Sequence, residues 1–87
     1  MQLGHSYVGA HQAERDYLCT LGEKLRAAIR ACLTSGRPHL AVALDTARDA
    51  VETVLTDEQA TSARLAVARA RAEIALETWR ESNDVRH

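Results

Sequence analysis

"TSGRPH", residues 34–39, is the strongest interruption in an otherwise helix-forming chain of 87 residues. Gly36 suits the left-handed conformation that ends many helices, and Pro38 suits the first turn of the helix that follows. Signals for strands are nearly absent, because β-branched residues are scattered and no stretch alternates apolar and polar residues for long. The sequence therefore predicts an all-α fold in which two helices meet at a tight turn.

The chain before this turn predicts one long helix from about residue 6 to residue 34. One stripe runs along it in alternating steps of four and three residues, and it begins with polar side chains at Tyr7, His11 and Glu14. Such a stripe favours packing against a neighbouring antiparallel helix. The apolar remainder of the stripe consists of Leu18, Leu21, Leu25, Ala28 and Cys32.

The chain after the turn leaves two arrangements open. "TDEQ", residues 56–59, is typical of a capping box, with Thr56 as N-cap and Gln59 reaching back. It predicts a break and a third helix over about residues 57–82. The apolar phase nevertheless continues from Leu55 to Leu65 at 100° per residue, and no glycine or proline intervenes. The predicted fold is therefore a three-helix bundle, or a helical hairpin with one long second helix.

The last helical segment carries two apolar stripes on opposite sides. One, which we call the Leu65 stripe, consists of Leu65, Ala68, Ala72, Leu76 and Trp79. The other, which we call the Val67 stripe, consists of Ala63, Val67, Ala70 and Ile74, and Ala60 extends it toward the amino terminus. A helix that is apolar on two faces contacts neighbours on both.

The amino-acid composition also favours self-association. Sixteen residues are alanine and none is phenylalanine, so the core of one copy should be thin. A short chain with a thin core gains stability from oligomerisation. We expect a homodimer formed through the Val67 stripe.

The polar start of the first stripe predicts a surface for a partner protein. If the first helix is longer than the second, its amino-terminal half lies beyond the bundle and meets solvent or a partner. Tyrosine and histidine are typical of interface edges, so the candidate partner-binding residues are Tyr7, His11, Glu14 and Tyr17. An ordinary buried polar pair is an alternative. A metal-binding bundle that uses His11 and Glu14 is another, although the chain offers no second such pair.

Net charge and motifs narrow the function further. Eleven basic and twelve acidic residues give a net charge of −1, so nucleic acid is not the expected partner. A dimeric DNA-binding regulator remains the alternative, with Arg64, Arg69 and Arg71 contacting phosphates. The sequence has neither a glycine-rich phosphate loop nor an HExxH motif. We therefore expect no enzymatic activity and no cofactor.

The two cysteines and the hydropathy pattern indicate a compartment. Cys19 and Cys32 have neither the spacing of a zinc site nor that of a redox pair, and free thiols are typical of reducing compartments. No signal segment and no apolar run of about 18 residues is present, so we expect a cytoplasmic protein without membrane contact. Residues 1–82 should form one helical domain and residues 83–87 a disordered tail. The favoured function is a small helical interaction protein: an adaptor, a co-chaperone or an inhibitor.

Overall fold

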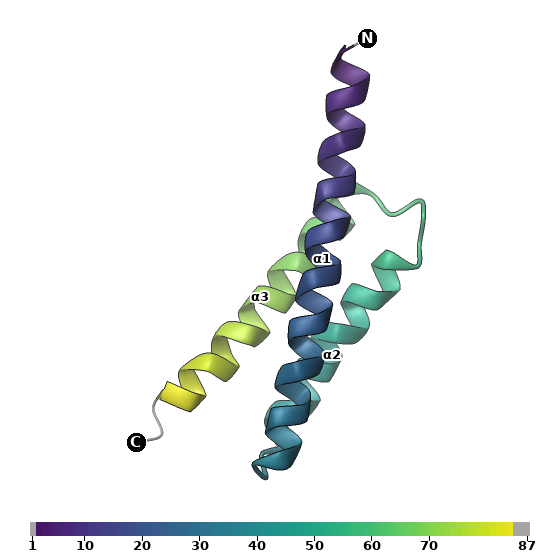
Figure 1. Cartoon of the computed structure of the whole chain (residues 1–87). Helices are drawn as coiled ribbons and strands as arrows, with labels where there is room; N and C mark the ends of the chain where they lie inside the picture. Colours follow the sequence, from purple (N-terminus) through teal and green to yellow (C-terminus); the bar gives the residue numbers. More distant parts are fainter. Residues whose placement is uncertain (1, 85–87) are drawn as a thin grey trace.

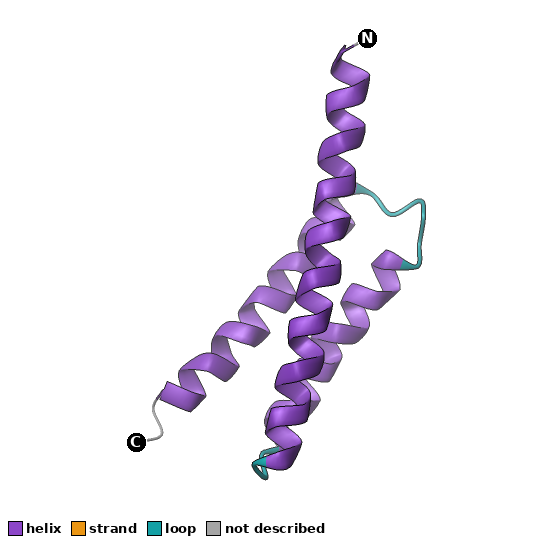
Figure 2. Cartoon of the chain, viewed as in Figure 1, coloured by secondary structure: helices purple, strands orange, loops and turns teal. Residues whose placement is uncertain are grey.

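The computed structural model describes the backbone of residues 2–84 and the side chains of residues 11–82. Three helices follow one another, α1 (Gln2–Thr34), α2 (Pro38–Leu55) and α3 (Ser62–Asp84), and no strand occurs within the described backbone (Figure 2). The chain reverses direction at each connection, so α2 is antiparallel to both α1 and α3 (Figure 1). The all-α, three-helix prediction is confirmed, and the alternative of one long second helix is wrong.

The turn between α1 and α2 forms as the sequence predicts. Gly36 has a positive φ of 75°, which a residue with a side chain adopts at a cost. The N–H of Arg37 donates to the carbonyl oxygen of Cys32 at 2.8 Å, and the N–H of Gly36 donates to that of Leu33 at 3.4 Å. These two bonds satisfy carbonyl groups at the end of α1, and Pro38 then opens α2.

The predicted capping box at Thr56 is wrong, although the break itself is present. The hydroxyl group of Thr56 donates to the carbonyl oxygen of Thr53 at 3.0 Å, so it closes α2 instead of opening α3. The helix N-cap is Thr61, whose hydroxyl oxygen accepts the N–H of Arg64 at 3.2 Å. The third helix consequently starts five residues later than the predicted Asp57.

Asp57 explains why the helix does not resume at once. Its carboxylate accepts the backbone N–H of Gln59 at 2.9 Å, which is the local turn that aspartate favours over a helix. Arg15 of α1 donates to the carbonyl oxygens of Leu55, at 2.6 Å, and of Asp57, at 3.3 Å. The connection is therefore fastened to α1 by a residue forty or more positions earlier in the sequence, a contact that no local pattern indicated.

The core lies where the apolar stripes of the three helices meet. Ala60 belongs to it, with 4 % of its surface exposed, so the expectation that it extends the Val67 stripe is wrong. Ala60 lies in the connection before α3, where helical phase does not apply. The largest fully buried side chains are Leu18, Leu25, Leu44, Val51 and Leu65.

The helices differ in length, and this leaves one end of α1 without a neighbour. α1 has 33 residues, against 18 in α2 and 23 in α3. Its amino-terminal segment extends past the α2–α3 connection, and α3 diverges from the other two helices toward its carboxyl end (Figure 1). α3 continues through Asp84, two residues into the predicted tail, and residues 85–87 lie outside the described part of the chain.

Candidate interaction surface

The two stripes of α3 have opposite environments. In the Leu65 stripe, Leu65 is 0 % exposed and Leu76 is 5 % exposed, because both pack against α1 and α2. In the Val67 stripe, Val67 is 54 % exposed and Ile74 is 66 % exposed. Ala70, which lies between them, and Ala63, which precedes Val67, are also exposed. Apolar side chains grouped on one surface mark contact sites more often than scattered ones do.

Two shallow hollows adjoin the Val67 stripe between α2 and α3. They have volumes of about 260 Å³ and 310 Å³; Val67 lines the first and Ile74 the second, while Arg71 lines both. α2 contributes small and apolar residues, namely Ala50 and Val54 to the first and Leu40, Ala43 and Ala47 to the second. No carboxylate belongs to either lining among the described side chains. The stripe and the hollows together form an apolar surface that arginine borders on the α2 side, while Glu73 and Glu77 border it on the other side, where they line a further hollow with Ala70 and Ile74.

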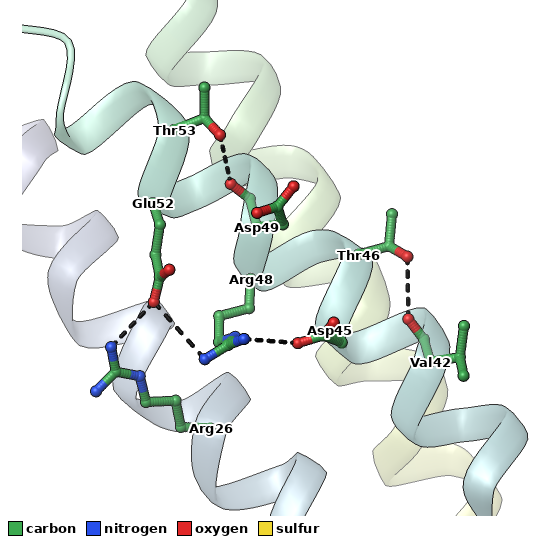
Figure 3. A network of polar contacts seen from close by, with 8 residues as sticks. All are labelled: Arg26, Val42, Asp45, Thr46, Arg48, Asp49, Glu52 and Thr53. Atoms are coloured by element: carbon green, nitrogen blue, oxygen red, sulfur yellow. Dashed lines mark hydrogen bonds and ion pairs between the residues drawn. The ribbon is translucent and has the colours of Figure 1, made fainter.

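The surface between α1 and α2 is polar by comparison. Arg26 of α1 forms an ion pair with Glu52 of α2 at 3.0 Å (Figure 3). Arg48 lies beside the same carboxylate at 3.8 Å and pairs with Asp45 at 2.7 Å (Figure 3). This network spans the α1–α2 boundary and gives its charges partners within the chain. The apolar surface on α3 has no such cover within the described chain.

The predicted partner-binding residues lie along α1, and two of them contact α3. The carboxylate of Glu14 forms an ion pair with Arg69 at 2.8 Å, and the two paired atoms are shielded from solvent. His11 is partly buried, and the side chain of Tyr7 lies outside the described residues. The ion pair explains why a carboxylate stands on the packing stripe of α1: it meets the arginine of a parallel helix.

Tyr17 makes the second polar contact between α1 and α3. Its hydroxyl group donates to the carboxylate of Glu73 at 2.7 Å, while 42 % of the residue stays exposed. This hydrogen bond to an anion raises the pKa of Tyr17 above its ordinary value of 10.0, because the protonated phenol is the form that can donate. Glu14 and Tyr17 therefore hold α1 against α3, and the outer part of the Tyr17 ring stays open.

The three arginines of the alternative DNA-binding surface do not act as one group. Arg64 pairs with Asp57 at 2.7 Å, and Arg69 pairs with Glu14 at 2.8 Å. Arg71 is exposed between the two hollows. Two of the three guanidinium groups are thus already neutralised by carboxylates, which weakens their attraction for phosphate.

The described side chains do not support the metal-binding alternative, and the described helices do not support a membrane span. Within the described residues, no group of three or more His, Cys, Asp or Glu side chains is close enough to hold a metal ion. Glu14, the proposed ligand beside His11, is paired with an arginine. None of the described helices is long and apolar enough to cross a bilayer.

Sequence reasoning missed the contribution of α2 to this surface. α2 places Ala43, Ala47 and Ala50 beside α3, and these small residues leave room for the hollows. A signal was available: Ala43, Thr46, Ala50 and Thr53 form an uncharged line in steps of three and four residues. The connection at residues 56–61 decides which helix that line faces. The sequence patterns predicted this connection incorrectly, because they placed the N-cap at Thr56.

Comparisons with known proteins returned no relative: no family model, no curated protein and no solved structure matches the chain.

Proposed function

We propose that this protein is a small helical protein–protein interaction module, an adaptor, co-chaperone or inhibitor, that acts as a homodimer. The observation that carries the proposal is the exposure of Val67 and Ile74 on a helix whose opposite face forms the core. Transfer of such side chains out of water contributes about 1.5–3 kcal/mol for each one that becomes fully buried. Dimerisation through the Val67 stripe would bury four of them, two from each copy.

The partner protein would bind the segment of α1 that extends past the bundle. Figure 1 shows no helix beside this amino-terminal segment of α1, and the proposed contact residues are those predicted at the start of the α1 stripe, Tyr7 and His11. A helix of fewer than about 12 residues is marginal in water when nothing packs against it, so a partner that covers the segment would stabilise it. The contacts of Glu14 and Tyr17 with α3 fix the direction in which the segment leaves the bundle.

The proposed compartment is the cytoplasm. Both Cys19 and Cys32 are free, which supports a reducing environment such as the cytoplasm.

Light scattering with matched variants tests the homodimer. We expect the wild-type protein to have the mass of a dimer and Val67→Ser/Ile74→Ser to have the mass of a monomer. The control, Leu33→Ser/Val42→Ser, changes two apolar side chains that are 62 % and 66 % exposed on α1 and α2, away from the stripe. It should remain a dimer. A wild-type protein that stays monomeric at high concentration would refute the dimer.

The partner surface requires a separate experiment. Affinity capture from the native host, followed by mass spectrometry, should recover a protein with the wild-type bait and lose it with Tyr7→Ala/His11→Ala. Retention of every captured protein by that variant would show that the projecting segment of α1 is not the binding surface.

A further inference from the structure

We propose that the second hollow between α2 and α3 binds a single-chain aliphatic carboxylate, with the carboxylate on Arg71 and the chain running toward Trp79. This inference goes beyond the proposed interaction function and does not depend on the homodimer. Three observations carry it: the apolar lining of the hollow, its size and length, and an arginine without a partner at one end.

The hollow reaches from the surface to the core. α3 diverges from the other helices toward its carboxyl end, and α2 presents only the short side chains of Ala43 and Ala47 to the resulting space (Figure 1). Leu44, which is 1 % exposed, belongs to the lining. Leu40 and Trp79 are partly buried beside it. A concave, mostly apolar surface with few polar groups is typical of ligand sites.

The polar groups of the lining are few. Among the described side chains they are Thr46, Thr78 and Arg71, and no carboxylate is present. The hydroxyl group of Thr46 donates to the carbonyl oxygen of Val42 at 3.0 Å, so its hydrogen is already engaged within α2. Arg71 is therefore the group that would orient a polar ligand atom.

Arg71 has no partner inside the chain. It is exposed, and within the described residues it forms neither an ion pair nor a hydrogen bond. Arg64 and Arg69 of the same helix, by contrast, are paired with Asp57 and Glu14. A guanidinium group offers a planar fork of N–H donors that matches a carboxylate. The charged end of the ligand should consequently be a carboxylate.

The size and length of the hollow select the rest of the ligand. Its volume is about 310 Å³, and a cavity of about 150 Å³ holds one benzene molecule, so the hollow has room for about twelve carbon atoms. Arg71 and Trp79 are eight residues apart, which is about 12 Å along α3. A narrow site of this length fits an aliphatic chain better than a compact ring system.

The acidic residues of α3 do not oppose this placement. Glu73 and Glu77 line a different hollow, on the other side of α3. Glu73 also accepts the hydroxyl group of Tyr17 at 2.7 Å. An anion on Arg71 therefore lies on the flank of α3 that these carboxylates do not occupy.

Titration with decanoate tests the site, because Trp79 is the only tryptophan of the chain and lines the hollow. Dilute monomeric protein and decanoate below its micelle concentration should give a saturable blue shift of the tryptophan emission, with one ligand per chain. From hexanoate upward, affinity should rise about two- to fourfold for each CH2 group and level off near twelve carbons. No saturable signal in either fluorescence or calorimetry, or affinity that rises undiminished to hexadecanoate, would overturn the inference.

A change of charge tests the head-group contact. Arg71→Gln should weaken decanoate binding by about fivefold and leave binding of the uncharged decanol unchanged, because an exposed ion pair is modest in strength. Arg80→Gln is the control, since Arg80 is exposed on the same helix outside the lining. Equal losses in the two variants would mean that net charge alone attracts the ligand, which would contradict the proposed contact.

A change of volume tests the chain-binding part. Ala43→Leu places extra carbons in the hollow from an exposed position, so it should weaken decanoate and decanol alike, by about tenfold. Ala27→Leu, at an exposed site on α1, should leave both affinities unchanged. Unaltered binding in Ala43→Leu would place the ligand elsewhere and overturn the inference.

Two further results separate this site from other surfaces. An emission shift with phosphatidylglycerol vesicles but none with soluble decanoate would indicate a membrane-binding surface and overturn the inference. The homodimer is decided independently by the mass of the wild-type protein and of Val67→Ser/Ile74→Ser. Failure of decanoate to bind would therefore leave the proposed function standing, and a monomeric wild-type protein would leave the ligand site standing.

Discussion

The two faces of α3 have similar sequences and different environments. Both stripes combine alanine with larger apolar residues and repeat in steps of three and four. One packs on α1 and α2 and belongs to the core, and the other is open to water in a single copy. The difference shows that apolar periodicity alone does not decide whether a face is buried within the chain.

The largest expected effect comes from shortening one side chain to alanine on each face. Leu65→Ala should lower the free energy of unfolding by about 2–5 kcal/mol, because Leu65 is fully buried and a cavity remains. Val67→Ala, at an exposed site of the same helix, should change it by less than about 0.5 kcal/mol when measured at concentrations below dimer formation. Urea unfolding of both variants checks the prediction, and equal losses would show that the Val67 stripe is covered within one chain.

The reverse change, from small to large, sharpens the comparison. Ala72→Leu should destabilise the monomer by about 1–3 kcal/mol, because Ala72 is 0 % exposed and the extra carbons have no space. Ala70→Leu should leave monomer unfolding within about 0.5 kcal/mol, since Ala70 is exposed. It should change the affinity of the dimer, because Ala70 belongs to the Val67 stripe that the second copy is proposed to cover. Urea unfolding and light scattering measure the two effects, and a stable Ala72→Leu monomer would contradict the core assignment.

The N-cap of α3 supports the whole helix, including both of its faces, and its loss should have a smaller effect on stability. Thr61→Ala removes the hydroxyl oxygen that accepts the N–H of Arg64, and it should cost about 1 kcal/mol of stability. Thr56→Ala removes only a bond to the end of α2, so its cost should be lower. Thermal or urea unfolding of both variants decides between the two caps. A greater loss in Thr56→Ala would restore the cap that the sequence indicated.

The smallest expected effect on stability comes from the hydrogen bond between Tyr17 and Glu73, and this effect depends on pH. Because the pKa of Tyr17 is raised in the folded protein, its hydrogen bond to Glu73 stabilises the fold fully below pH 10.0. That contribution disappears as the pH rises through the folded pKa. Near neutral pH, the wild-type protein should therefore unfold at a slightly higher urea concentration than Tyr17→Phe. The difference between the two midpoints should shrink well above pH 10.0. A difference that is constant over that range would exclude the ionisation of Tyr17 as its source.

Local patterns predicted the helices and the first turn, and they failed where distant residues decide. Gly36 and Pro38 carry their conformational preferences in any context, so the α1–α2 turn could be predicted from six residues. The second connection could not, because Asp57 forms a turn that competes with a cap at Thr56, and Arg15 of α1 fixes it.

The candidate surface divides in the same way. The periodicity of α3 predicted two contact faces, and the Val67 stripe is exposed in the single chain as a face for a second copy would be. The polar residues at the start of the α1 stripe were predicted to meet a partner. That stays a prediction. Glu14 and Tyr17 also contact Arg69 and Glu73, which lie more than fifty positions away, so no local pattern could indicate these contacts.

The central claim is that a second copy covers the Val67 stripe. Hydroxyl-radical footprinting at low and high protein concentration tests it most directly, because it reports the solvent exposure of each side chain. Val67 and Ile74 should be labelled in dilute solution and protected in concentrated solution, while Leu33 and Val42, which are similarly exposed in one copy, remain labelled in both. Labelling of Val67 and Ile74 that does not change with concentration would contradict the claim.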